Sequence, residues 1–223
     1  MNVVDIEDIS HRLASWRIDL GQFARARQAL AYEPPPIGHV RARGATIASR
    51  LARALGQSGQ AELREAVQAL TPGADPHVRM HVMLEQAENA EPLAAVTGCE
   101  EVLEQALQLE FAGVAMKARL LRADALRRAG RFQEAAAAMH ELQPLLEAQQ
   151  PADLTLGQAW WLAAQVFESA GHGDQALIAL GQGARWVNHV ALPHVPAEFR
   201  DSFLHRNATH RALLAAADRR LAQ

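Results

Sequence analysis

Apolar residues recur every three or four positions along most of this sequence, in stretches that end at glycine or proline. This spacing places them on one face of an α-helix. The clearest stretch covers 113–148, where the apolar positions stop before Gly130 and resume with Phe132. Because glycine tolerates the left-handed turn that often ends a helix, the pattern predicts two helices packed against each other across a turn at Gly130.

The same spacing returns twice along the chain. Gly21 and Gly171 are each followed five residues later by an alanine, as Gly130 is by Ala135. A small side chain at this position of the second helix lets the two helix axes approach closely. The recurrence therefore predicts a repeated helix pair rather than a single catalytic loop.

The whole chain can be divided in this way. We expect helices over 5–18, 22–31, 39–57, 60–70, 76–89, 92–109, 112–129, 131–148, 153–170, 173–188, 197–205 and 208–221. Glycines and prolines lie between them, for example Pro72 and Gly73. No stretch shows the alternating β-branched and aromatic pattern of a strand. The prediction is an all-α chain.

The pattern of small residue, large residue, glycine turn, aromatic residue and alanine resembles the tetratricopeptide repeat (TPR). Residues at the matching positions are Trp160, Ala164, Phe167, Ala176, Leu180 and Gly183 in one pair, and Ala123, Leu126, Ala135, Met139 and Leu142 in the preceding one. The resemblance implies a right-handed α–α superhelix, a TPR-like solenoid, of about five helix pairs plus a C-terminal capping helix. It implies a single domain over 1–223, with the best-matching repeats at 113–148 and 157–188 and the cap at 196–222. The spacing from Ala135 to Ala176 is longer than the usual unit of about 34 residues.

The end of the chain adds a second resemblance. The stretch "VPAEFRDSFLHRNATHRALLAAADRR" at 195–220 resembles the tail that closes the helical-repeat region of large multidomain bacterial signalling and transcription regulators. Its residue Asn207 is a favourable N-cap for a last helix. Phe199, Phe203 and Leu204 can cover the apolar edge of the last pair, which a stack of repeats needs at its end.

Charge and composition exclude several classes of function. The net charge is −3, which argues against a nucleic-acid-binding surface. The N-terminal residues do not resemble a signal peptide, no apolar run is long enough to cross a membrane, and the single cysteine, Cys99, allows no internal disulfide. We expect a cytoplasmic protein with no direct contact to nucleic acid or membrane.

The sequence contains no motif typical of catalysis or of cofactor binding. A phosphate-binding G-x-x-x-x-G-K-[ST] loop is absent, and the chain's one lysine, Lys117, lies inside a predicted helix. His77, His81 and Glu85 recur at intervals of four, so they can share a helix face as metal ligands or as solvated side chains; we expect the latter. Four histidines near the C-terminus, His189, His194, His205 and His210, form no recognisable catalytic set. We expect no enzyme activity, no metal and no cofactor.

The most informative polar residues are expected on the inner surface. In TPR folds the first helix of each pair lines the concave face, and the corresponding residues here include Trp161, Lys117, Asp124, Arg127, Arg128, Gln165 and Glu168. Trp160 fits the core position, which turns Trp161 about 100° away from it, and an exposed Trp is typical of a binding hot spot. The residues that clamp a C-terminal carboxylate in chaperone-binding TPR proteins are missing.

Blocks of like charge admit two interpretations. Arginines cluster at 41–53 and basic residues at 117–131, whereas 80–116 contains seven glutamates and no Lys or Arg. Neighbouring helices can pair these charges across a solvated face, or the charges can orient a partner in a groove.

These observations predict a non-catalytic scaffold or sensor region of a bacterial signalling or transcription-regulatory system, which binds a protein or peptide in its concave groove. The alternative is a small-molecule or metal-binding protein, hydrolytic or not, on the same helical frame. A homodimer through an unmatched apolar edge is a further expectation about partners.

Overall fold

The computed structural model describes residues 3–31 and 38–221, and these ranges contain helices, turns and loops but no β-strand. Their α-helices are α1 (Val3–Asp19), α2 (Phe23–Leu30), α3 (Gly38–Ala54), α4 (Gln60–Ala69), α5 (Pro76–Asn89), α6 (Pro92–Gln108), α7 (Ala112–Arg128), α8 (Phe132–Leu146), α9 (Leu156–Ser169), α10 (Gly173–Arg185) and α11 (Ala208–Leu221). The predicted all-α class is confirmed. No helix in the described ranges is long and apolar enough to cross a membrane.

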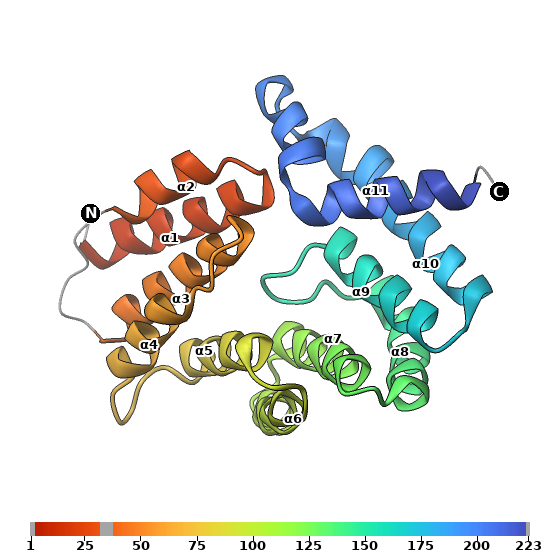
Figure 1. Ribbon diagram of the computed structural model, residues 1–223. Helices are drawn as coiled ribbons and strands as arrows, with labels where there is room; N and C mark the ends of the chain where they lie inside the picture. The colour runs from red at the N-terminus through yellow and green to blue at the C-terminus, as the bar shows by residue number, and fades with distance from the viewer. Residues whose placement is uncertain (1–2, 32–37, 222–223) are drawn as a thin grey trace.

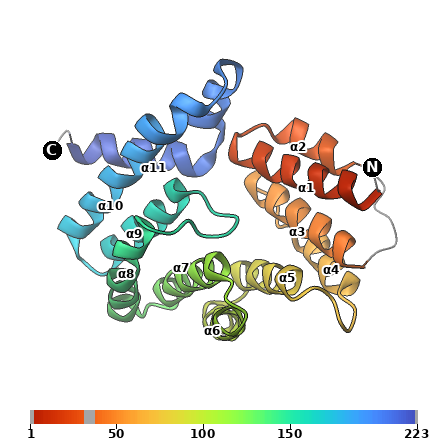
Figure 2. The same cartoon turned by 180° about the vertical axis from the view of Figure 1, so that it is seen from behind.

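Consecutive helices pack against each other in two layers. Each odd-numbered helix from α1 to α9 contacts the even-numbered helix that follows it and also the next odd-numbered helix. The pairs follow one another around a ring, with the odd-numbered helices on the inside and the even-numbered helices on the outside (Figures 1 and 2). The loop between α8 and α9 extends into the middle of this ring.

Local sequence signals explain where the helices begin and end. Helix α5 covers the predicted range 76–89 residue for residue, because the Asp75 carboxylate accepts hydrogen bonds from the first-turn N–H groups and Pro76 tolerates the first helical position. Gly130 and Gly171 have positive φ angles of 76° and 79° and lie between the helices of their pairs. Their predicted role as turn residues is confirmed.

The predicted contact residues within the pairs are buried. Ala135 and Met139 are fully buried on α8, and Ala176 is 3% exposed on α10. Trp160 and Phe167 on α9 belong to the same hydrophobic core, which extends from α5 to α11. Phe132, expected to face the preceding helix, is instead 43% exposed, at the first position of α8.

The segment after α10 differs from the prediction. Instead of ending at residue 188, the helix continues as a π-helix over Trp186–Ala191, and short 3₁₀ and π turns then lead to α11. Asn207 caps α11 as predicted, since its Oδ1 accepts a hydrogen bond from His210 N–H at 3.1 Å. Phe203 is buried in the core beside Phe199 and Leu204, as expected for a cap.

The ring is closed by a seam between residues 19–22 and residues 202–207. Ser202 Oγ donates to Leu20 O at 2.8 Å, Asn207 Nδ2 donates to Asp19 O at 2.9 Å, and the Gln22 amide donates to Ser202 Oγ. Gly21 lies so close that a Cβ there would stand 2.4 Å from Ser202 O. The first helix pair is therefore joined directly to the C-terminal cap.

Candidate binding site inside the ring

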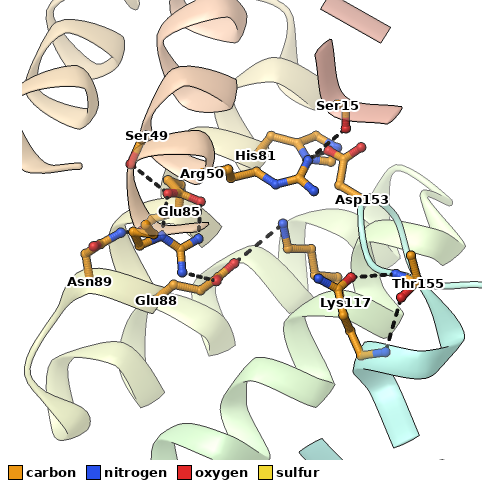
Figure 3. Close-up of polar contacts among 12 residues, drawn as sticks. Ser15, Ser49, Arg50, His81, Glu85, Glu88, Asn89, Lys117, Asp153 and Thr155 are labelled. Atoms are coloured by element: carbon orange, nitrogen blue, oxygen red, sulfur yellow. Dashed lines mark hydrogen bonds and ion pairs between the residues drawn. The ribbon is translucent and has the colours of Figure 1, made fainter. Parts of the chain in front are cut away.

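Charged side chains from the inner helices converge on the middle of the ring (Figure 3). The group, here called the interior polar cluster, consists of Asp19, Arg50, Arg53, His81, Glu85, Glu88, Lys117 and Asp153. Its members come from α1, α3, α5, α7 and the α8–α9 loop. Glu85 and Lys117 are almost completely buried, whereas Asp153 is exposed. Charges removed from water persist only when they are paired or hydrogen-bonded, so their partners define what the site can do.

Arg53 is the centre of one half of the cluster. Its Nε and NH2 donate to the two oxygens of Glu85 at 3.1 and 2.9 Å, and its NH1 lies 2.8 Å from Glu88. Glu85 also accepts from Ser49 Oγ at 2.7 Å. Burial lowers the pKa of Arg53, but the charges of Glu88 and Glu85 outweigh burial and raise this pKa above its usual value. For Glu88 the directions are reversed: burial raises the pKa, and the charges of Arg53 and Lys117 outweigh burial and lower it. Arg53 and Glu88 are therefore both charged at neutral pH.

Lys117 lies deeper than a concave-surface position implies. It is 2% exposed, and its Nζ stands 3.7 Å from a Glu88 oxygen. The α8–α9 loop covers this end of α7, held by a hydrogen bond from Ala152 N–H to Gly113 O at 2.9 Å. The sequence pattern placed Lys117 on the inner helix, but the loop that buries it has no periodic signal.

The tip of the same loop meets α5. His81 Nδ1 and Asp153 Oδ2 are 2.8 Å apart, and His81 Nε2 lies 3.3 Å from His77 Nε2. Burial lowers the pKa of His81, and this outweighs Asp153; the pKa of Asp153 falls below its usual value because the hydrogen bond from His81 and the charges of Arg50 and Lys117 outweigh burial. A neutral imidazole thus donates to an ionised carboxylate. Asp153 holds a φ of 51°, an uncommon conformation that functional loops often contain.

Asp19 is the weakest-paired member of the cluster. Its Oδ1 is buried and accepts no hydrogen bond from the described residues, and the nearest arginine nitrogen, Arg50 NH2, is 3.7 Å away. Burial raises the pKa of Asp19 to about 6, although Arg50 opposes the rise. Its charge therefore changes close to neutral pH.

A first cavity of about 390 Å³ lies on one side of the cluster. Three of the sequence-predicted binding residues, Asp124, Arg128 and Trp161, line it together with apolar side chains such as Phe23 and Leu121. Its volume falls within the range of about 300–1,000 Å³ that is usual for ligand pockets.

The remaining predicted residues lie outside the first cavity. Arg127 donates to Asp124 Oδ1 through Nε and NH2 at 2.9 and 2.8 Å. Gln165 is half-buried, and Glu168 is exposed and forms an ion pair with Arg220 of α11. The structure thus brings together three of the seven predicted residues.

A second cavity of about 300 Å³ lies on the other side of the cluster and shares Asp19, Arg50, Asp153 and Leu154 with the first. Its lining is strongly basic, and its complete set of charged and imidazole side chains is His11, Arg12, Asp19, Arg43, Arg50, His77, His81, Lys117 and Asp153. Lys117 contributes to this cavity rather than to the first.

The histidine groups noted in the sequence do not converge as ligand sets. Glu85 is bound to Arg53 and is buried, so it does not form a solvated face with His77 and His81. No group of three or more His, Cys, Asp or Glu in the described ranges could hold a metal ion. Among the C-terminal histidines only His210 is buried, where burial lowers its pKa to about 4 and Nδ1 donates to Phe203 O at 3.0 Å.

Cys99 is unsuited to act as a nucleophile. The side chain is fully buried, and burial together with the charge of Glu88 raises its pKa to about 12. The thiolate, which is the reactive form, is therefore scarce at neutral pH.

The most central residues, Asp19, Arg53, Glu88 and Asp153, were not among the predicted site residues. Part of the signal was present, because the arginine block at 41–53 and the glutamate block at 80–116 pair across α3 and α5 through Arg53. The contacts of Asp19 and Asp153 join residues far apart in the chain, and no local spacing in the sequence predicts them.

Comparisons with protein-family models, with curated proteins and with solved structures found no match. The geometry of the ring and its two cavities is therefore the basis for the proposals below.

Proposed function

We propose that the chain is a TPR-like repeat protein, a right-handed α–α superhelix, that binds a short segment of a protein partner in the first cavity and catalyses no reaction. The observation that supports this most directly is the position of Trp161. The residue is half-buried, lines the cavity, and is adjacent to Trp160, whose side chain fills the core. A Trp held at the edge of a pocket offers a large rigid surface at small entropic cost.

The walls of the first cavity suit a mixed polar and apolar segment. Phe23, Leu121 and Trp161 supply apolar surface, while Asp124 and Arg128 are fixed to each other by a hydrogen bond of 3.1 Å. Paired charges of both signs orient a ligand without binding it by net charge alone. The volume suits a few side chains of an extended segment rather than a folded domain.

The biological setting belongs to the same proposal. The C-terminal stretch resembles the closing tail of bacterial signalling and transcription regulators, and in the structure its Phe203 and Asn207 cap the last pair and join the seam. A ligand bound inside the ring can change the fit of neighbouring helix pairs and thereby signal to a partner module.

The test is a selection of peptides from a random library on the purified protein. Selected peptides should bind wild type and lose at least about tenfold in affinity with Trp161→Ala or Arg128→Glu, because one hot-spot contact contributes about 1.4 kcal/mol or more. The matched control is Leu177→Ala, which removes an exposed apolar side chain on the outer helix α10. Equal binding by wild type and Trp161→Ala would exclude the first cavity as the site.

The alternative function, binding of a small molecule, is favoured by a different observation. The seam closes the ring, and the two internal cavities have the volumes of small-ligand pockets. The test is a thermal-shift screen of small metabolites on protein that elemental analysis shows to lack stoichiometric zinc and iron. We expect at least one metabolite to raise the melting temperature of wild type. Stoichiometric metal would instead favour a metal site.

A further inference from the structure

We propose that the second cavity binds a small anionic ligand, with the Lys117 ammonium and the Arg50 guanidinium as the principal donors to its phosphate or carboxylate group. This inference develops the small-molecule alternative and does not depend on peptide binding in the first cavity.

The charges that line the second cavity favour an anion. Four cationic side chains reach it from three helices, namely Arg12 of α1, Arg43 and Arg50 of α3, and Lys117 of α7. Only two carboxylates, Asp19 and Asp153, line the same space. Arg12 and Arg43 take part in further interactions of their own, so the donors offered to a ligand are Arg50 and Lys117. Two cationic groups at one confined wall attract an anion.

Lys117 has unused hydrogen-bonding capacity at the wall of this cavity. It is the only lysine of the chain and is 2% exposed. Its ammonium carries three N–H donors, yet it forms no hydrogen bond with the described residues, and its ion pair to Glu88 is 3.7 Å long. Because Lys117 lines the cavity, a ligand oxygen there can accept from these N–H groups.

Arg50 provides the second donor from the neighbouring helix. Its NH1 donates to Ser15 Oγ at 3.0 Å, whereas its NH2 is 3.7 Å from Asp19, too far for a hydrogen bond. The guanidinium therefore keeps N–H groups for a ligand. A planar guanidinium together with an ammonium is a frequent combination for phosphate and carboxylate groups.

The two carboxylates of the cavity do not block an anion. Asp153 is engaged by His81 at 2.8 Å, and Asp19 faces Arg50 at the wall shared with the first cavity. The volume of about 300 Å³ accepts an anionic group together with a small organic body. The exposed ring of Trp16 offers an apolar surface at the rim.

The experiment is titration calorimetry of the full chain with inorganic phosphate and, separately, with acetate, at constant ionic strength. We expect wild type to bind at least one of the two anions at one site. Lys117→Met should weaken binding at least about tenfold, since a hydrogen bond to a charged group contributes that much or more. Arg122→Gln is the matched control, because Arg122 lies on the same helix and pairs outward with Glu100; its affinity should equal that of wild type.

The two arms identify the anionic group, because binding of phosphate alone indicates a phosphate-bearing ligand and binding of acetate indicates a carboxylate. Circular dichroism establishes that each variant is folded, and Arg50→Gln repeats the test if Lys117→Met does not fold. The proposal is overturned if wild type binds neither anion, or if the folded variant binds as tightly as wild type. Failure here leaves the peptide proposal intact, since that test depends on Trp161 in the other cavity.

Discussion

Replacing Gly21 by alanine tests whether the seam holds the ring together. The residue has a φ of 69°, and an added Cβ would stand 2.4 Å from Ser202 O and 3.1 Å from Arg206 Cβ. Gly130 is the matched control, because it has a φ of 76° and its Cβ would meet no atom within 4 Å. Both substitutions incur the strain of a left-handed alanine, about 1–2 kcal/mol. Only Gly21→Ala forces the backbone at 202 away.

The displacement should break the seam's hydrogen bonds. Three of them join residues 19–22 to residues 202–207, and each contributes about 0.5–1.5 kcal/mol net. We therefore expect Gly21→Ala to lower the free energy of unfolding by about 2–4 kcal/mol more than Gly130→Ala does. Urea denaturation followed by circular dichroism measures this difference, and hydrogen exchange should show faster exchange at the Asn207 amide only in Gly21→Ala. Equal stability of the two variants with unchanged exchange at residue 207 would refute the seam as a structural closure.

Three further substitutions test the interior. Asp19→Asn should be more stable than wild type by up to about 3 kcal/mol at pH 7 and by little at pH 4. The pKa of Asp19 in the folded protein, about 6, exceeds its ordinary value of 3.8, so the wild-type fold loses stability as the pH rises through this interval. Thermal melts at several pH values across the interval measure the difference. Arg53→Met removes the arginine that pairs with Glu85 and Glu88, and it should cost about 3 kcal/mol or more of the free energy of unfolding in urea. Arg131→Gln breaks an exposed pair and should leave the urea midpoint unchanged. Ala135→Leu should destabilise by about 1–3 kcal/mol through overpacking; a similar loss in Ala137→Leu, on the exposed side of α8, would contradict that explanation.

The helix pairs could be predicted from the sequence because their signals are local. The glycine and alanine spacing within each pair marks a turn and a close contact, and Pro76 and Asn207 mark helix starts. Such signals need only a few neighbouring residues, so they survive without knowledge of the rest of the fold. The α-to-π change after Arg185 has no comparable signal and was missed.

The candidate site was predictable only in part, for a physical reason. Trp161 could be assigned to the inner surface because helical geometry turns it away from Trp160. The burial of Lys117 depends on the α8–α9 loop, and the pairing of His81 with Asp153 depends on where that loop ends in space. Ring closure depends on the small rotations between successive helix pairs. These rotations add up over the chain, and no single residue in the sequence indicates their sum.

The seam also has a consequence for the order of folding. Its hydrogen bonds connect residues about 180 positions apart, whereas the helix pairs form from residues close in the chain. Contacts with so large a sequence separation are slow to form because the intervening chain must first be ordered. We therefore expect folding to pass through an open arc of completed helix pairs, with the two ends meeting in the last step.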